Sequence, residues 1–405
     1  MSYPRNPDDS FLDVYMRYTA QQESPTMFHF WVGSTVLAAA LGRKCYMNKR
    51  FYRLYPNFFT TLVAGSGRCR KSTAIALGVD LLDKIPNILK FQGTVTQEQF
   101  LREIHQATPE NGSSPTVLVY ASELSAFLKH KQNNKPLIDT LTDLFDCPSL
   151  REYKTKNRGI DIVRDAFICI LAATTPRGVA RSVPEEAREE GYASRVIWVF
   201  QAAPEPNRYN DLTDDCTDGY TREETPEESN LKNHAQELLI SCSSLSGEFK
   251  LTPAGRDWYR TWYKLYMETE TPDRHVEGMF SRKHDHILRT GLIIAASYRS
   301  KLIDEHILEA SLVAINQVED LTPLVFSQVG SDMTTYHFDR FCYIMRRFKI
   351  LAHSEALRRM YPCDAKAFEQ IVLTAEGQGL IRREVDRGYK YVWIAAEKEL
   401  KKSQE

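Results

Sequence analysis

The feature that most constrains this chain is a glycine-containing loop between a predicted buried strand and a predicted helix. Residues 58–64 form an apolar and β-branched run that favours a buried strand, and residues 73–77 begin a helical pattern. The loop between them has the sequence Gly-Ser-Gly-Arg-Cys-Arg-Lys-Ser at positions 65–72. A strand, this loop and a helix in that order predict a site for the phosphates of a nucleotide.

The residue types in this loop suit a phosphate ligand. Backbone N–H groups of the loop and of the helix N-terminus attract an anion. Lys71 would add positive charge at the β- and γ-phosphates, and the Ser72 hydroxyl would bind Mg²⁺. Arg70 stands where the motif usually has a glycine, and the alternative is an ordinary strand-turn-helix corner with a surface lysine. The residues expected to contact ATP are Gly65, Ser66, Gly67, Arg70, Lys71, Ser72 and Thr73.

The composition limits the classes of protein that fit. The 405 residues are enough for about two or three domains, and 42% apolar with 26% charged residues is typical of a soluble globular protein. A net charge of −1 excludes a global basic field, so any contact with nucleic acid must come from local patches. The eight cysteines form no CxxC pair, which argues against zinc and favours reduced thiols in a cytoplasmic protein. We expect no signal peptide and no membrane span.

The predicted elements indicate an α/β fold. Strands at 58–64, 116–121, 167–173 and 195–201 alternate with helices, which is typical of a largely parallel sheet. Two helices are expected before them, at 11–16 and 28–41, and three after them, at 253–267, 279–297 and 304–325. The predicted domains are N-terminal helices at 1–47, the α/β core at 48–203, an acidic linker or mobile loop at 204–230, a helical domain at 231–330, a winged helix at 331–397 and a charged tail at 398–405.

An acidic residue follows the second of these strands. Phosphoryl hydrolysis needs a carboxylate that orients and deprotonates water, and Glu123 is the candidate. Many ATPases have Asp-Glu here, whereas this chain has Ser122 and Glu123; the Ser122 hydroxyl would bind Mg²⁺ less well than a carboxylate. The predicted metal-binding residues are therefore Ser72, Ser122 and Glu123. The alternative is that Glu123 is an acid at the start of a helix, favoured by the helix dipole.

Two further strand ends carry polar residues. The strand at 167–173 leads into Thr174 and Thr175, of which we expect Thr175 first, and Thr174 second, to sense the γ-phosphate or hold the attacking water. A simple capped strand end is the alternative. Arg195 precedes the last strand, where an arginine can reach the γ-phosphate of a neighbouring subunit. Its alternative role is a salt bridge to the acids at 185–190.

The order of these elements resembles that of the AAA+ ATPases. A phosphate loop, an acidic strand end, Ala-Ala-Thr-Thr-Pro at 172–176 and Ser-Arg before an apolar strand follow one another. Among AAA+ proteins the pattern is most similar to the minichromosome maintenance helicases, and still more to the helicase-like proteins of phages and mobile elements that follow primase domains. Those helicases have Asn and Phe where this chain has Thr175 and Val196. The resemblance extends from residue 58 to about residue 395, through short motifs.

The resemblance implies further roles. The helical domain would be the AAA+ lid, since residues 281–289 resemble the lid helix, with Arg282 as the sensor-2 arginine and Arg289 as a second lid arginine. Arg195 and Arg282 would act together with Glu123 and Thr175 in catalysis. An arginine finger and a lid arginine need a neighbouring subunit, so we expect a homo-oligomer, with a hexamer foremost.

Two basic hairpins are candidates for DNA binding. Residues 150–162 are predicted to form a hairpin, and a hairpin at this place points into the central channel of the helicases that the chain resembles. The second hairpin is the wing at 380–394. For the first hairpin, an exposed hairpin with no ligand is an equally good interpretation. For the second, contact with duplex phosphates or docking of a protein is an equally good interpretation. The expected DNA-binding residues are Lys154, Lys156, Arg158, Arg382, Arg383, Arg387 and Lys390.

The sequence therefore predicts an ATP- and Mg²⁺-dependent ring-shaped DNA helicase or translocase of phage or mobile-element replication. Single-stranded DNA is the expected partner, with a primase or polymerase as a further one. The departures at Arg70 and Ser122 favour an alternative, a nucleotide-switched replication initiator or helicase loader with weak hydrolysis. A small-molecule kinase fits poorly, because it would leave the helical domain and the winged helix without a role.

Overall fold

The computed structural model describes residues 6–110, 112–128, 134–155, 159–184, 187, 191–205, 225–269, 277–326, 333–360, 363–385 and 389–394. The chain divides into two compact units, and the boundary lies between Val325 and Phe326. The segments predicted as N-terminal helices, α/β core and helical domain all contribute to the first unit. Among the described residues, no helix combines the length and the apolar character that crossing a bilayer requires.

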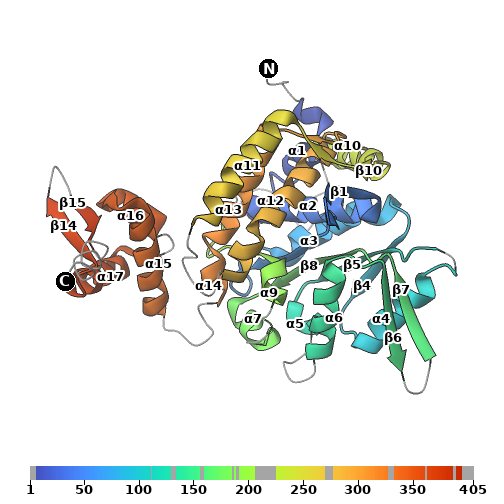
Figure 1. Cartoon of the computed structure of the whole chain (residues 1–405), viewed down its shortest axis with the longest axis horizontal. Helices are drawn as coiled ribbons and strands as arrows, with labels where there is room; N and C mark the ends of the chain where they lie inside the picture. The colour runs from blue at the N-terminus through green and yellow to red at the C-terminus, as the bar shows by residue number, and fades with distance from the viewer. Residues whose placement is uncertain are drawn as a thin grey trace, which may run out of the picture. The chain divides into compact units, whose positions relative to one another are not determined.

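The first unit is built on a five-stranded sheet whose strands are all parallel (Figure 1). Every residue of β3 and β8 is buried, as a parallel sheet covered on both faces requires. This confirms the predicted α/β core with a parallel sheet. The strand order is β4-β5-β8-β3-β9, with bounds β3 Phe59–Val63, β4 Ile88–Gln92, β5 Thr116–Ala121, β8 Ile168–Thr174 and β9 Val196–Phe200.

Helices cover this sheet and connect its strands. α2 is apolar on all sides, and it is correspondingly buried across β3, β5, β8 and β9. The two predicted N-terminal helices are present as α1 and α2. The helices up to β9 are α1 Phe11–Tyr18, α2 Thr26–Leu41, α3 Lys71–Asp80, α4 Gln97–Ala107, α5 Leu124–Leu128, α6 Lys135–Phe145, α7 Pro176–Ser182 and α9 Tyr192–Arg195, with short 3₁₀ turns η1 Pro7–Asp9, η2 Gly42–Lys44 and η3 Leu81–Lys84.

Two hairpins extend from the end of the sheet where its strands begin. One is β1 Cys45–Lys49 with β2 Tyr52–Leu54, which leads into β3. The other is β6 Leu150–Thr155 with β7 Gly159–Arg164, which leads into β8 and is the hairpin predicted at 150–162. Figure 1 shows β6 and β7 projecting away from the sheet. Because β3 and β8 are neighbours in the sheet, both hairpins leave from the same end of it.

The helices that follow β9 pack on the sheet unit. α12 contacts α9, α2 and α13, and β10 pairs in parallel with β1. The helix predicted at 304–325 is divided into two, because Pro323 lacks an N–H donor and disfavours a helical residue before it. The elements are α10 Pro226–Ser243, β10 Gly247–Glu248, β11 Lys250–Leu251, α11 Pro253–Met267, α12 Glu277–Ser297, β12 Leu302–Ile303, α13 Glu305–Glu319 and α14 Thr322–Phe326.

The second unit has a core of its own. Phe341, Phe368 and Tyr391 meet edge to face at its centre. The three helices and the hairpin predicted here are present, and a short third strand, β13, joins the hairpin in the antiparallel order β13-β15-β14. The bounds are α15 Met333–Phe348, β13 Ile350–Ala352, α16 His353–Arg359, α17 Ala365–Gly377, β14 Ile381–Val385 and β15 Tyr389–Trp393.

Candidate nucleotide site and its arginines

The loop at residues 65–70 joins the end of β3 to the start of α3. Gly67, Cys69 and Arg70 all have positive φ angles, of 68°, 62° and 41°. Left-handed residues in succession turn the chain sharply before the helix begins at Lys71. The free N–H groups at the start of α3 therefore face the end of the sheet, where an anion would find hydrogen-bond donors.

Arg70 takes the left-handed position that a glycine usually occupies in this motif. Its side chain turns away from the loop, and its Nε donates a hydrogen bond to Glu23 Oε2 at 2.6 Å. The Ser24 hydroxyl donates to the Arg70 carbonyl oxygen at 3.1 Å. The segment between α1 and α2 thus holds Arg70 in its unusual conformation and leaves the phosphate side of the loop open.

Lys71, the first residue of α3, reaches back to the start of the loop. Its Nζ donates to the carbonyl oxygens of Ala64 and Gly65 at 3.0 and 3.1 Å. Burial lowers the pKa of Lys71, while the nearby Cys69 and Glu123 raise it in part. Ser72 and Thr73 are exposed on the first turn of α3. The ammonium group, the helix start and the two hydroxyls are thus available to phosphates and Mg²⁺.

A hydrogen bond joins the candidate base to the neighbouring strand. The Thr174 hydroxyl donates to Glu123 Oε1 at 2.8 Å, and Ser125 donates to the same oxygen at 3.2 Å. Thr174 also lies opposite Val63 in the sheet, and its carbonyl oxygen accepts from the N–H of Ala64 at 3.3 Å. β8 lies between β5 and β3, so Thr174 connects the acid directly to the residue before the loop.

The two threonines at the end of β8 make different contacts. The Thr175 side chain caps α7, because its hydroxyl oxygen accepts the N–H of Gly178 at 3.0 Å. Thr174, the second choice from the sequence, is the residue whose hydroxyl contacts Glu123. Ser122 is exposed next to Glu123 and makes no hydrogen bond to the described residues. A role for Thr175 or Ser122 in catalysis stays a prediction.

Gly178 belongs to this site, although the sequence pattern did not single it out. A Cβ atom at Gly178 would lie 2.2 Å from Thr174 Oγ1 and 3.0 Å from Glu123 Oε1. A side chain at this position would displace the threonine, the acid or the start of α7. The only signal in the sequence was a glycine within the first turn of a helix that follows a candidate strand end.

The two arginines expected to act on a neighbour lie together at the other end of the sheet. Arg195 Nη2 donates to Asp146 Oδ2 at 2.8 Å, and its Nη1 donates to the Gly191 carbonyl oxygen at 2.9 Å. Arg282 Nη1 lies 3.7 Å from Asp146 Oδ1. Burial, and then the charge of Arg195, lowers the pKa of Arg282. One carboxylate therefore holds two guanidinium groups.

The arginines differ in how accessible they are. The Arg195 side chain is 11% exposed, whereas that of Arg282 is 29% exposed. Arg195 thus forms a salt bridge to Asp146, a partner that was not expected. The expected partners, the acids at 185, 186, 189 and 190, lie outside the described residues, so that alternative stays a prediction. Arg289 is buried, and its Nη1 donates to both oxygens of Asn57 at 2.8 and 3.0 Å. Of the lid arginines expected from the sequence, Arg282 alone retains an accessible guanidinium.

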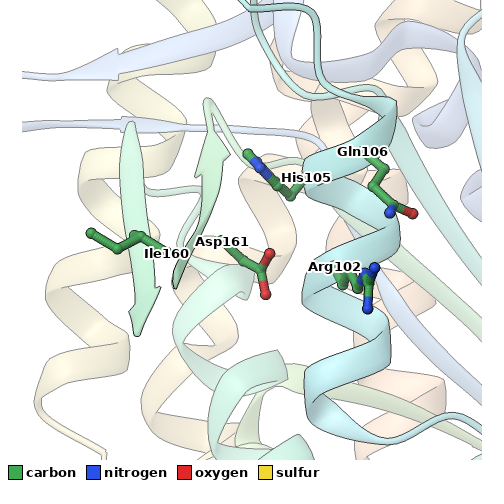
Figure 2. Close-up of a pocket in the computed structure, with 5 residues that line it drawn as sticks. All are labelled: Arg102, His105, Gln106, Ile160 and Asp161. Atoms are coloured by element: carbon green, nitrogen blue, oxygen red, sulfur yellow. The ribbon is translucent and has the colours of Figure 1, made fainter. Parts of the chain in front are cut away.

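The β6–β7 hairpin is supported from one side by α4. His105 Nδ1 lies 3.3 Å from the backbone N and O atoms of Ile162. An open hollow of about 630 Å³ lies between this helix and β7. Figure 2 shows the side chains that line it, with that of Asp161 between the strand and the helix. The hollow is lined by Arg102, His105, Gln106, Ile160 and Asp161. It lies beside the hairpin, away from the loop at 65–70.

The residues expected to bind DNA fall into three groups. Lys154 is exposed on β6, with Nζ 3.9 Å from Glu152 Oε2. On the second unit, Arg382 pairs with Glu384 at 2.6 Å, and Arg383 pairs with Glu369 at 2.6 Å. Lys390 lies opposite Glu384 on β15. The remaining three, Lys156, Arg158 and Arg387, lie outside the described residues. The two described wing arginines are thus neutralised by acids of their own unit.

Comparisons with known proteins leave the site without a named counterpart. No family model matches this chain, and no curated protein is significantly similar to it. Within the part of the chain that the structure describes, no three His, Cys, Asp or Glu side chains gather in the manner of a metal centre. The arrangement of Lys71, Glu123 and Thr174, where β3, β5 and β8 end, is therefore the main indication of function.

Proposed function

We propose that the chain is a P-loop ATPase of the AAA+ type that works in a ring and moves single-stranded DNA. In this proposal the helices after β9 form the lid and the second unit is a winged helix. The observation that carries it is the connection through Thr174, which links the acid Glu123 to Ala64 at the start of the loop. An acid held this close to a phosphate-binding loop is the arrangement that nucleotide hydrolysis needs.

The residues of the site have distinct tasks in this proposal. The loop N–H groups and Lys71 bind the phosphates, and the Ser72 hydroxyl contributes to Mg²⁺ binding. Glu123 accepts a proton from the attacking water, and Thr174 fixes the orientation of the carboxylate. Mg²⁺ supplies charge neutralisation of the phosphates. Ser122 is a neutral ligand where a carboxylate is usual, so binding of Mg²⁺ depends more on the phosphates themselves.

The position of the arginines supports action on a neighbouring copy. Val196 lies opposite Phe59 at the start of the paired strands, and the loop begins six residues further along. At about 3.3 Å per residue, Arg195 is roughly 20 Å from its own loop, which is longer than an arginine side chain. Arg282 shares Asp146 with Arg195 and so lies at the same end. Both can therefore reach only the phosphates of another copy, and the accessible Arg282 is the better candidate.

Replacement of the acid tests the proposed hydrolysis. We expect the wild-type protein to hydrolyse ATP faster in the presence of single-stranded DNA, and Glu123→Gln to abolish turnover while ATP binding is retained. Glu110→Gln, at an exposed acid, serves as the matched control. Turnover by Glu123→Gln at the wild-type rate would refute the assignment of the base.

Mixing two inactive variants tests the divided site. Lys71→Ala lacks a working loop, and Arg282→Ala lacks the arginine. In a ring of randomly mixed subunits, about one site in four combines an intact loop with an intact neighbouring arginine, so part of the turnover should return on mixing. No recovery on mixing, in rings shown to exchange subunits, would rule out action of Arg282 on a neighbour.

A nucleotide-switched initiator or helicase loader is the second candidate. It is favoured by Ser122 and by the engagement of both Nη atoms of Arg195 within its own subunit. Such a protein would bind ATP and load onto DNA with negligible turnover. A wild-type protein that loads onto DNA in an ATP-dependent way, yet neither hydrolyses ATP at a measurable rate nor separates strands, would select this function over the motor.

A further inference from the structure

The β1–β2 hairpin ends in a cationic and aromatic tip to which the proposed function gives no role. The tip has the sequence Lys-Arg-Phe-Tyr-Arg at positions 49–53. Phe51 is 86% exposed, more than any other large apolar side chain among the described residues, and Tyr52 beside it is 49% exposed. Arg50 has a positive φ of 53°, which turns the chain at the tip and directs Phe51 outward.

The cations of this tip pack on aromatic rings. The Arg50 guanidinium lies 5.0 Å from the centre of the Phe51 ring, and that of Arg53 lies 4.5 Å from the Tyr46 ring. Lys49 lies 5.0 Å from the Tyr259 ring and so fixes the hairpin to α11. None of the three cations is within ion-pair distance of a carboxylate in the described parts of the chain. Asp285 of α12 accepts a hydrogen bond from the Tyr52 hydroxyl at 3.3 Å and attracts the Lys49 ammonium. The positive charge that the described part of the unit leaves without a close acid is therefore that of Arg50 and Arg53.

The wing arginines provide a contrast within the same protein. Arg382 and Arg383 both pair with glutamates at 2.6 Å, so their charges are balanced locally. Arg50 and Arg53 carry the same charge as the wing arginines, but neither is paired with a carboxylate of the described residues. Like charges only three residues apart repel each other, and a ligand with several negative charges relieves that repulsion. The tip thus suits a polyanion better than the wing does.

The location of the tip fits a nucleic-acid path along one end of the sheet. β1–β2 leads into β3, and the basic hairpin β6–β7 leads into the adjacent β8. Arg43, just before β1, connects the two hairpins where they join the sheet. Its Nη1 donates to the Ala166 carbonyl oxygen at 2.9 Å, and its Nε lies 3.4 Å from Asp165 Oδ1, both just after β7. The two hairpins are therefore held as one assembly.

We propose that the tip at residues 49–53 binds single-stranded nucleic acid, with a base stacked on Phe51 and phosphates held by Arg50 and Arg53. A single strand alternates bases and phosphates, which matches an exposed ring flanked by guanidinium groups. The tip does not read sequence, because stacking and phosphate contacts accept any base. This inference rests on the proposed function only in taking single-stranded nucleic acid as the ligand.

Binding to oligo(dT), and to an oligomer of the same length with abasic residues, tests the two contacts separately. We expect Phe51→Ser to weaken binding of the full-length protein to oligo(dT) by about fivefold or more, as loss of one stacked base does. Binding to the abasic oligomer should not change, and Phe51→Tyr should retain wild-type affinity for both. Leu302→Ser is the matched control, since Leu302 is an exposed apolar residue of the same unit on β12.

The arginines should behave differently from the ring. Arg50→Ser and Arg53→Ser are each expected to weaken binding to both oligomers alike and to lower the slope of log affinity against log salt by about one. Arg382→Ser, at a neutralised wing arginine, should have a smaller effect. Equal losses for Phe51→Ser on both oligomers would overturn the stacking contact, and unchanged binding by all three tip variants would overturn the site.

Two further outcomes separate this inference from other possibilities. If Phe51→Ser dissociates the oligomer in sedimentation and leaves oligo(dT) affinity unchanged, the tip contacts a second copy of the chain and the inference is wrong. If Phe51→Ser weakens oligo(dT) binding as expected while turnover does not depend on Glu123, the tip is a nucleic-acid site and the proposed hydrolysis fails instead.

Discussion

At the scale of single residues, Arg70 has a left-handed conformation, with a φ of 41°, in the loop at 65–70. A non-glycine residue in the left-handed region costs about 1 kcal/mol or more relative to glycine. Arg70→Gly and Arg70→Ala both lose the contact with Glu23, so their difference isolates the backbone. We expect Arg70→Gly to be more stable than Arg70→Ala by about 1 kcal/mol in urea unfolding. Equal stabilities would mean that the loop relaxes without strain when the arginine is removed.

Gly178 gives a second prediction at this scale. Because a Cβ atom would meet Thr174 and Glu123, we expect Gly178→Ala to lower ATP turnover at least about tenfold and the free energy of unfolding by about 1–3 kcal/mol. Gly377→Ala is the control, since a Cβ atom there meets nothing within 4 Å. Wild-type turnover and stability in Gly178→Ala would show that the strand end and α7 shift freely.

At the scale of elements, the packing of α12 on α9 depends on a buried histidine. His286 Nε2 donates to the Ser194 carbonyl oxygen at 3.1 Å, and burial lowers the pKa of His286 to about 4 from its ordinary value of 6.5. The unfolded chain therefore takes up a proton before the folded one does. The contribution of neutral His286 to the free energy of unfolding is fully present above about pH 6.5. It is lost as the pH falls toward 4, and the loss is on the order of 3 kcal/mol.

Urea unfolding at several pH values checks this expectation. His286→Gln keeps an N–H donor for Ser194 and cannot titrate, so its stability should fall less steeply than that of the wild type between pH 6.5 and 4. His306→Gln, at an exposed histidine of α13, should follow the wild type. Parallel pH profiles for wild type and His286→Gln would show that this histidine contributes nothing to acid sensitivity.

Elements with a continuous apolar run or a strong helical period could be predicted from the sequence, and those with mixed character could not. The strand predicted at 116–121 is β5, a continuous apolar run, and the helix predicted at 253–267 is α11, whose aromatic residues recur at helical spacing. β4 was missed because Lys90 and Gln92 interrupt it, as suits a half-buried edge strand. β1 and β2 were missed because the cations at their tip gave no alternating pattern.

The candidate site shows the same limit. The loop, Lys71 and Glu123 could be proposed because their signals are local in the sequence. The order of Thr175 and Thr174 could not be decided there, because their different contacts, Thr175 with the start of α7 and Thr174 with Glu123, are made only in the folded chain. Asp146, the partner of Arg195 and Arg282, comes from the end of α6, far from both in sequence. No local pattern indicates a long-range pair of this kind.

At the scale of the whole molecule, the two units should unfold separately. Buried apolar residues of the first unit extend to Val325, and the second unit has its own core around Phe341 and Tyr391. A variant that ends at Val325 is expected to keep the main calorimetric transition within a few degrees and to lose a smaller one. A shortened chain that aggregates or melts without cooperativity would show that the units depend on each other.

The loop at 65–70 and the pair Arg195 and Arg282 lie at opposite ends of the sheet, so the specific activity of the protein should depend on its concentration. If the loop and the arginines are two halves of one catalytic centre, as proposed, a single chain holds no complete centre. Specific activity would then rise with protein concentration until every chain has neighbours, even though no residue changes. In a cell, the number of copies made would set when such a protein becomes active, without a separate regulator.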